Sequence, residues 1–227
     1  MPEFVPNADL LRSLGRLVRG LSALFWGLPL ALIICFYTAR ADGLKSLGMA
    51  PPIGATGLLV YGLWQLGAFQ KQERVWRNAL DRAQILGVIN CGLSPFLYWW
   101  NRIPGHLFYT VMVVLFALSA LLLLASVNLV LQRLSAMLPD EGLRIETKQF
   151  TTLNLNLLLA TFIAALFYWG LAHGQSIPRW LGIIAAIMDR GLFWFLIVLV
   201  LLPLAMTMAL LWKTKEVILE SIFSTKP

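Results

Sequence analysis

Apolar residues occur in long, uninterrupted blocks that short polar connections separate. An α-helix rises about 1.5 Å per residue, so about 20 such residues cross a hydrocarbon core of about 30 Å. The pattern predicts an all-α, polytopic integral membrane bundle over residues 20–212. The six expected transmembrane helices cover residues 20–39, 53–69, 83–100, 106–131, 151–172 and 191–212.

The segment that precedes the first block has a different, two-sided pattern. Leucines recur at helical spacing at positions 10, 14, 17 and 21, whereas Arg12, Arg16 and Arg19 fall on another side. This pattern predicts a basic amphipathic helix over residues 1–19 that lies on the membrane surface. A cleavable signal peptide is the alternative, because a basic start and an apolar core precede the small residues Ala39 and Ala41. Both interpretations give the same downstream topology.

Two of the expected spans contain unusual residues. The second span carries glycines at positions 54, 57, 62 and 67, which would let a neighbouring helix approach closely. Asn90, Ser94 and Pro95 interrupt the third span, which is only just long enough to cross. We favour a kinked span over a re-entrant loop for this segment.

Charge sets the expected orientation. Only 13% of the residues are charged, about half the share typical of a soluble domain, and the formal net charge is +7. With the N-terminus in the cytoplasm, the six-span topology places 5 of the 18 basic residues outside and the other 13 inside; the outer ones are Arg40, Lys45, Arg102, Arg179 and Arg190. This asymmetry obeys the positive-inside rule. It predicts that both ends lie in the cytoplasm, with a cytoplasmic tail at residues 213–227. The short loops and compact length favour a bacterial-type inner (plasma) membrane.

The basic residues and the cysteines point to lipid rather than to other ligands. Basic residues beside apolar segments are expected to contact anionic lipid headgroups at the cytoplasmic face, and we expect no nucleic acid as a partner. Cys35 and Cys91 lie within separate spans, so neither a disulfide nor a zinc site is predicted. No catalytic motif, metal site or cofactor site is recognised in the sequence.

Four asparagines form the candidate polar cluster within the bilayer. Asn90, Asn128, Asn154 and Asn156 are expected in the inner half of spans three, four and five. Asparagines at this depth usually form hydrogen bonds between helices, and a polar vestibule for a substrate is the alternative. Asn154 and Asn156 are two residues apart, so both cannot face one partner helix.

Three further candidates are expected at the outer interface, at the ends of spans. They are His106, His173 and Asp189. Isolated histidines at this level are usually ordinary headgroup-level residues. A cluster of all three in the folded protein would instead favour a lipid-modifying membrane enzyme.

These observations favour a multi-pass membrane protein without catalytic chemistry, and they lean against an enzyme. The first expectation is an accessory, scaffold or assembly subunit with a membrane protein partner or a second copy of itself. A transporter or channel for a small or apolar substrate is the alternative, with spans two and three lining the path. A lipid-modifying enzyme ranks third.

Overall fold

The computed structural model describes the backbone of residues 8–41, 43, 45–69, 73–137, 141–173 and 179–223. Within these ranges, the side chains of residues 8–11, 45, 143, 167–196 and 221–223 are not described. The described chain is helical throughout apart from short connections. In chain order the elements are α1 (Ala8–Arg40), the 3₁₀ turn η1 (Lys45–Leu47), α2 (Ala50–Leu66), α3 (Arg74–Leu93), α4 (Phe96–Arg102), α5 (Leu107–Met137), α6 (Glu141–His173) and α7 (Arg179–Phe223).

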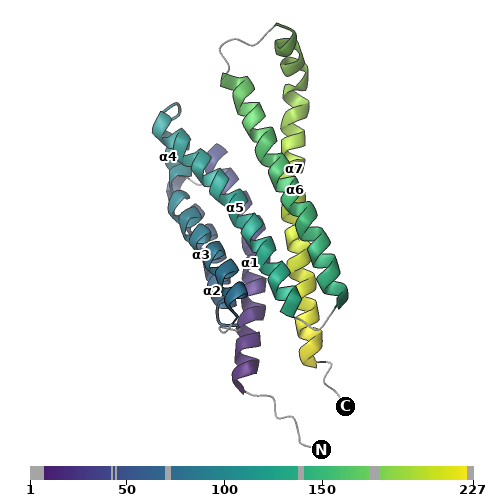
Figure 1. The fold of residues 1–227 in the computed structure, drawn as a ribbon. Coiled ribbons are helices and arrows are strands. Elements are labelled where there is room, and N and C mark those ends of the chain that lie inside the picture. The colour runs from purple at the N-terminus through teal and green to yellow at the C-terminus, as the bar shows by residue number, and fades with distance from the viewer. Residues whose placement is uncertain are drawn as a thin grey trace, which may run out of the picture.

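The helices form an elongated bundle in which the chain repeatedly reverses direction (Figure 1). Helix α1 packs against α2 and α7, α3 packs between α2 and α5, and α6 joins α5 and α7. The N-terminal start of α1 and the C-terminal end of α7 lie at the same end of the bundle (Figure 1). We call this the terminal end, and we call the other the far end, where α4 lies.

Four helical segments among the described residues are long and apolar enough to cross a membrane: Arg12–Arg40, Leu107–Met137, Arg144–Leu166 and Ile197–Glu220. They lie in α1, α5, α6 and α7, and they overlap the first, fourth, fifth and sixth predicted spans. The structure therefore supports an integral membrane protein, but it does not confirm six spans. Helix α2 has only 17 residues, and α3 carries charged residues over its first two turns.

The separate surface helix expected at residues 1–19 is not confirmed. Residues 8–40 form one continuous helix, and Leu17 and Leu21 are fully buried in the bundle core. Their helical spacing reflects packing against other helices rather than insertion into a membrane surface. Similarly, residues 213–223 of the expected tail continue α7, and Ile218 is buried.

Close contact between α1 and α2 depends on two glycines. A Cβ atom built on Gly20 would lie 2.8 Å from the carbonyl oxygen of Gly62, and one on Gly62 would lie 3.1 Å from the carbonyl oxygen of Gly20. The backbones can approach this closely only because neither residue has a side chain. Of the expected glycines, Gly54 and Gly57 instead face open space.

The break predicted in the third span occurs at Ser94 and Pro95. Both residues keep right-handed helical dihedral angles, and the Tyr98 amide donates to the Pro95 carbonyl at 3.1 Å, which tightens the chain locally. Helix α4 therefore follows α3 towards the far end (Figure 1). This course agrees with a kinked helix rather than a re-entrant loop.

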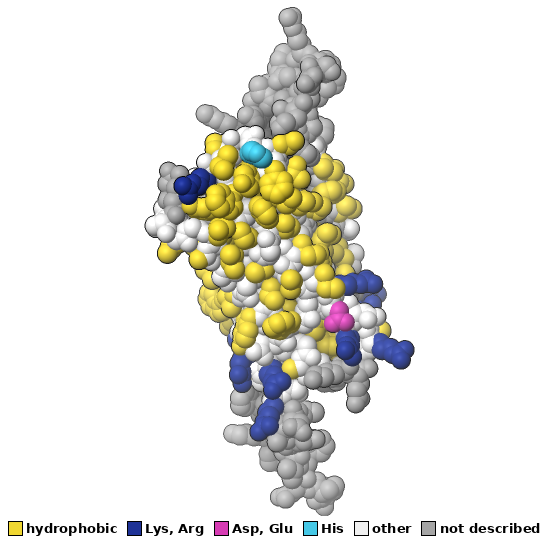
Figure 2. Space-filling view, turned by 90° about the vertical axis from the view of Figure 1, so that its left-hand side faces the viewer, with side chains coloured by type: hydrophobic (Ala, Val, Ile, Leu, Met, Phe, Trp, Pro, Cys, Tyr) yellow, Lys and Arg dark blue, Asp and Glu magenta, His cyan; other side chains and the backbone are white. Residues whose placement is uncertain are grey.

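Surface chemistry divides the bundle along its long axis. Figure 2 shows a broad apolar surface between the two ends, with Lys and Arg side chains gathered towards one of them. The described basic side chains near the terminal end are Arg12, Arg16, Arg19, Arg74, Arg77, Arg82, Arg133, Arg144, Lys148, Lys213 and Lys215, whereas Arg40 and Arg102 belong to the far end. This distribution matches an apolar belt within lipid and a basic rim at one surface.

Candidate functional site

Two of the four candidate asparagines meet in the bundle, and a threonine completes their contact. Asn128 of α5, Asn154 of α6 and Thr207 of α7 are all fully buried. The Asn154 amide nitrogen lies 3.0 Å from the Asn128 side-chain oxygen and 2.9 Å from the Thr207 hydroxyl, while the Asn128 amide nitrogen donates to the same hydroxyl at 2.9 Å. We call these three residues the amide cluster. It connects the three consecutive helices α5, α6 and α7.

A proline next to the amide cluster explains why polar groups gather there. Pro203 lies inside α7 and has no amide hydrogen, so the Leu199 carbonyl one turn earlier lacks its usual helical donor. The Thr161 hydroxyl of α6 reaches this carbonyl at 3.0 Å. The Pro203 carbonyl in turn accepts from the Thr207 hydroxyl at 2.8 Å and from the Asn154 amide at 3.2 Å. Helix α6 therefore satisfies backbone groups around a helix-interior proline of α7.

The amide cluster has the chemistry of a structural contact. The Thr207 hydroxyl donates its single proton to Pro203, so it can only accept from the two asparagines. The second amide hydrogen of Asn128 goes to the Leu124 carbonyl at 2.8 Å. One acceptor, the side-chain oxygen of Asn154, is buried without a hydrogen-bond partner. Because all three side chains are fully buried, they do not open onto a polar vestibule.

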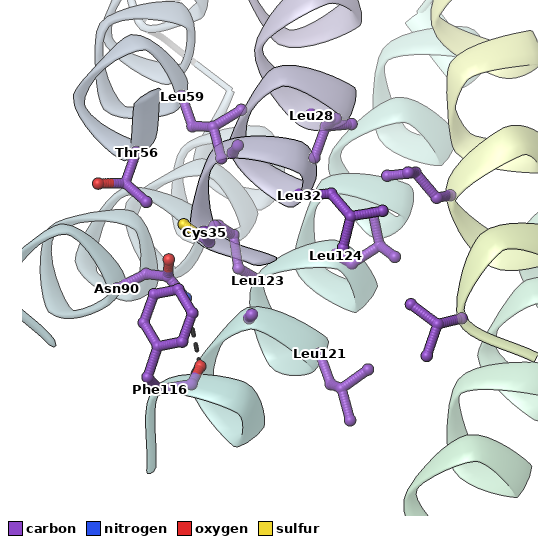
Figure 3. Close-up of a pocket in the computed structure, with 14 residues that line it drawn as sticks. Leu28, Leu32, Cys35, Thr56, Leu59, Asn90, Phe116, Leu121, Leu123 and Leu124 are labelled. Carbon is purple, nitrogen blue, oxygen red and sulfur yellow. Dashed lines mark hydrogen bonds between the residues drawn. The ribbon is translucent and has the colours of Figure 1, made fainter. Parts of the chain in front are cut away.

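Asn90 lies away from the amide cluster. Its amide nitrogen contacts the Ser119 hydroxyl of α5 at 3.1 Å. Ser119 is nine residues from Asn128 along α5, a rise of about 14 Å, so Asn90 lies nearer the middle of the bundle than Asn128 does. A cavity of about 150 Å³ adjoins Asn90 and is otherwise lined mostly by leucines (Figure 3).

Asn156 points away from both sites. It is exposed on the outer face of α6, and no hydrogen-bond partner for it occurs among the described residues. Asn154 is buried and Asn156 lies on the surface, so the two asparagines do not face the same neighbouring helix.

Of the outer-interface candidates, the structure describes only the side chain of His106. Its ring packs on Tyr109 with centroids 5.1 Å apart, and Tyr109 stacks on Trp99. His106 is exposed and belongs to an aromatic group where α4 turns into α5. The side chains of His173 and Asp189 lie outside the described residues. Among those described, no group of three His, Cys, Asp or Glu side chains could hold a metal ion.

Comparisons with family models, curated proteins and solved structures found no match to this chain. The site must therefore be interpreted from its own chemistry.

Sequence reasoning missed the hydroxyl partners of the asparagines. Thr161, Thr207 and Ser119 were not singled out, because threonine and serine are common in membrane helices and often bond to their own backbone. A usable signal was Pro203 inside an apolar helix. A helix-interior proline in lipid leaves one carbonyl without its helical donor, and Ser or Thr side chains can supply one.

Proposed function

We propose that the protein is a non-catalytic accessory or scaffold subunit that binds a helix of another membrane protein through the outer face of α6. The observation that carries the proposal is Asn156, an exposed amide on a part of α6 whose exposed neighbours Leu153, Leu159 and Ala160 are apolar. Lys148, eight residues earlier, lies at the basic rim, so Asn156 is about 12 Å deeper along the helix. At that depth its surroundings are hydrocarbon.

An amide facing hydrocarbon is costly, because lipid offers no hydrogen-bond partner. A second helix can supply one, and asparagines commonly join membrane helices in this way. The residues around Asn156 suit such a contact. Exposed Ile145, Thr152, Asn156, Leu159 and Ile163 recur at intervals that sum to seven residues, as in the seam of a coiled coil. We call this set the α6 stripe.

Photo-crosslinking in native membranes tests the proposal. A photoreactive amino acid replaces Leu159 in the α6 stripe, and the matched control carries it at Leu115, a lipid-facing position of α5. We expect one defined protein product from position 159, no such product from position 115, and loss of the product when Asn156→Leu is added. Equal products from both positions, or a product unaffected by Asn156→Leu, would contradict the proposal. A product of twice the chain mass would identify the partner as a second copy.

We also propose a six-span topology with both ends in the cytoplasm of a bacterial-type inner membrane. Helix α2 and the α3–α4 pair would supply the two additional crossings. The end of α2 and the start of α3, which both lie at the terminal end, support this (Figure 1). The basic rim at that end supports the cytoplasmic orientation. Anionic headgroups would contact this rim, for example in a groove of about 270 Å³ that includes Arg82 of α3 and Arg133 of α5.

A further inference from the structure

The cavity beside Asn90 lies between helices from the N-terminal and the C-terminal parts of the chain. Helices α1, α2, α3 and α5 form most of its wall, and Val200 and Leu204 of α7 complete it. Leu32, Leu121 and Val200 are only half-buried, so the cavity reaches the lipid-facing surface of the bundle. Its volume is about 150 Å³, a size at which an apolar cavity accommodates a benzene-sized group.

The hydrogen bonds of Asn90 fix which of its amide atoms remains available. The Ser119 hydroxyl donates its proton to the Phe116 carbonyl at 2.9 Å, so towards Asn90 it can only accept. The Asn90 atom 3.1 Å from that hydroxyl is therefore the NH₂ group. The side-chain oxygen of Asn90 has no hydrogen-bond partner among the described residues, although the side chain is only 3% exposed.

This oxygen is turned towards the part of the cavity near Thr56 and Cys35 (Figure 3). The Thr56 hydroxyl donates to the Pro52 carbonyl at 2.7 Å, so its proton is already used. The site thus combines an apolar wall with one unused acceptor. A charged headgroup would lose its hydration here without compensation, whereas a neutral group with one donor would satisfy Asn90.

We propose that this cavity binds a neutral, single-chain lipid through a hydroxyl group that donates to the side-chain oxygen of Asn90. The hydrocarbon chain extends from the cavity past Leu32 and Leu121 into the bilayer. Fatty alcohols and protonated fatty acids share this chemistry. This site is independent of the α6 stripe, so failure of either proposal leaves the other standing.

The test uses the full chain in lipid nanodiscs and three photoreactive C16 probes that differ only at the chain end: a primary alcohol, a carboxylic acid and a methyl-terminated alkane. We expect saturable labelling of cavity residues by the alcohol, with half-saturation at about tenfold lower concentration than for the alkane, the difference that one hydrogen bond in hydrocarbon provides. Saturable labelling by the acid that increases at low pH would identify the protonated fatty acid as a second ligand, whereas no saturable labelling by the acid at any pH would restrict the site to alcohols; both support the neutral-hydroxyl proposal. Saturable labelling by the acid that does not change with pH would show that the carboxylate binds as well and would overturn the proposal. Equal labelling by alcohol and alkane, or no saturable labelling, would overturn it.

Two variants separate binding from folding. Ala120 lines the cavity, and Ala117 lies three residues earlier on the exposed side of the same helix. We expect Ala120→Phe to fill the cavity and abolish saturable alcohol labelling, while Ala117→Phe retains it. Asn90→Leu should raise the half-saturating alcohol concentration to that of the alkane. Labelling that persists in a folded Ala120→Phe protein would also overturn the proposal.

Discussion

At the scale of single residues, the bundle depends on polar groups that compensate for one proline. Pro203 removes a backbone donor from α7, and Thr161 supplies one from α6. The Thr161 hydroxyl also lies 2.8 Å from the Leu157 carbonyl of its own helix, so its proton is shared between two acceptors. The contact across helices is useful only while the Leu199 carbonyl lacks its own amide donor.

This dependence gives a double-mutant prediction. In the natural sequence, Thr161→Val should destabilise the protein by about 1 kcal/mol, because the Leu199 carbonyl loses its donor in a low-dielectric environment. In a Pro203→Ala background, the alanine amide restores the helical bond and Thr161→Val should have little effect. Reversible unfolding in mixed micelles measures the four free energies. Equal effects of Thr161→Val in both backgrounds would show that the hydroxyl is not compensating for the proline.

The asparagines allow a second comparison between residues of the same type. Asn154→Leu removes the donor to Asn128 and to the Pro203 carbonyl and should lower the free energy of unfolding by about 1–2 kcal/mol. Asn156→Leu, two residues further on, removes an exposed amide and should leave the stability of the isolated chain unchanged or higher. The same unfolding measurement compares the two variants. A larger loss of unfolding free energy for Asn156→Leu than for Asn154→Leu would contradict the assignment of the two roles.

How far the sequence predicts such details depends on the partner of each residue. The helical period places Asn154 and Asn156 on different faces without any structure. It does not reveal that Asn128 meets Asn154 while Asn90 meets Ser119, because that choice depends on the relative heights of helices. Heights are set by packing and connection lengths, so an expected position in the inner half of three spans does not say which asparagines meet.

At the scale of elements, apolar blocks predict where helices cross but not where they end. Helix α1 begins well before its apolar block, and α7 continues well beyond its block. The polar residues there remain helical because their leucines and isoleucines, such as Leu17 and Ile218, are buried against neighbouring helices. Hydropathy values do not reflect this packing between helices. For the same reason the sequence suggested a separate surface helix.

The α1–α2 contact gives a prediction at this scale. Gly20→Ala would place a methyl group 2.8 Å from the Gly62 carbonyl oxygen, so the two helices must separate and the protein should lose stability. Gly15→Ala, one and a half turns earlier in α1, meets nothing within 4 Å and should be neutral or mildly stabilising through helix propensity. Thermal unfolding of both variants in detergent tests this pair. A Gly20→Ala protein as stable as Gly15→Ala would show that the close approach is absent.

At the scale of the whole molecule, charge separates the two ends of the bundle. The start of α1, the end of α7, the end of α2, the start of α3 and most described basic side chains share the terminal end (Figures 1 and 2). This agrees with the alternation on which the sequence-based topology rests. The orientation in the membrane is a prediction from the positive-inside rule and does not come from the shape of the bundle.

Cysteine accessibility tests the orientation in cells. In a cysteine-free background, Arg12→Cys and Lys215→Cys should react with a membrane-impermeant maleimide only after the membrane is opened. His106→Cys, at the far end, should react in intact cells whose outer barrier is permeabilised. The reverse pattern would show that the protein has the opposite orientation in the membrane. Reaction of Arg12→Cys and Lys215→Cys from opposite sides would exclude an even number of crossings.

The groove between α3 and α5 gives a prediction about bound lipid. Replacing both Arg82 and Arg133 with glutamine should reduce anionic phospholipid that co-purifies with the chain, because guanidinium groups bind phosphate strongly. Arg12→Gln with Arg16→Gln makes the same change in charge on α1 and should have a smaller effect. Lipid mass spectrometry after gentle extraction quantifies the anionic phospholipid bound to each double variant. Equal losses of bound lipid in the two variants would indicate general attraction to the basic rim instead of binding in the groove.

Helices α6 and α7 are longer than a bilayer is thick. Their 33 and 45 residues correspond to about 50 and 68 Å, whereas a bilayer with its headgroups is about 40–45 Å thick. Residues 141–149 of α6 and 213–223 of α7, at the terminal end, carry most of the charged residues of these two helices. These helix ends lie outside the apolar stretches that match the hydrocarbon core, so they would extend into the water on that side. Two helix ends of this kind would offer proteins of the adjoining aqueous compartment a contact surface without any separate soluble domain.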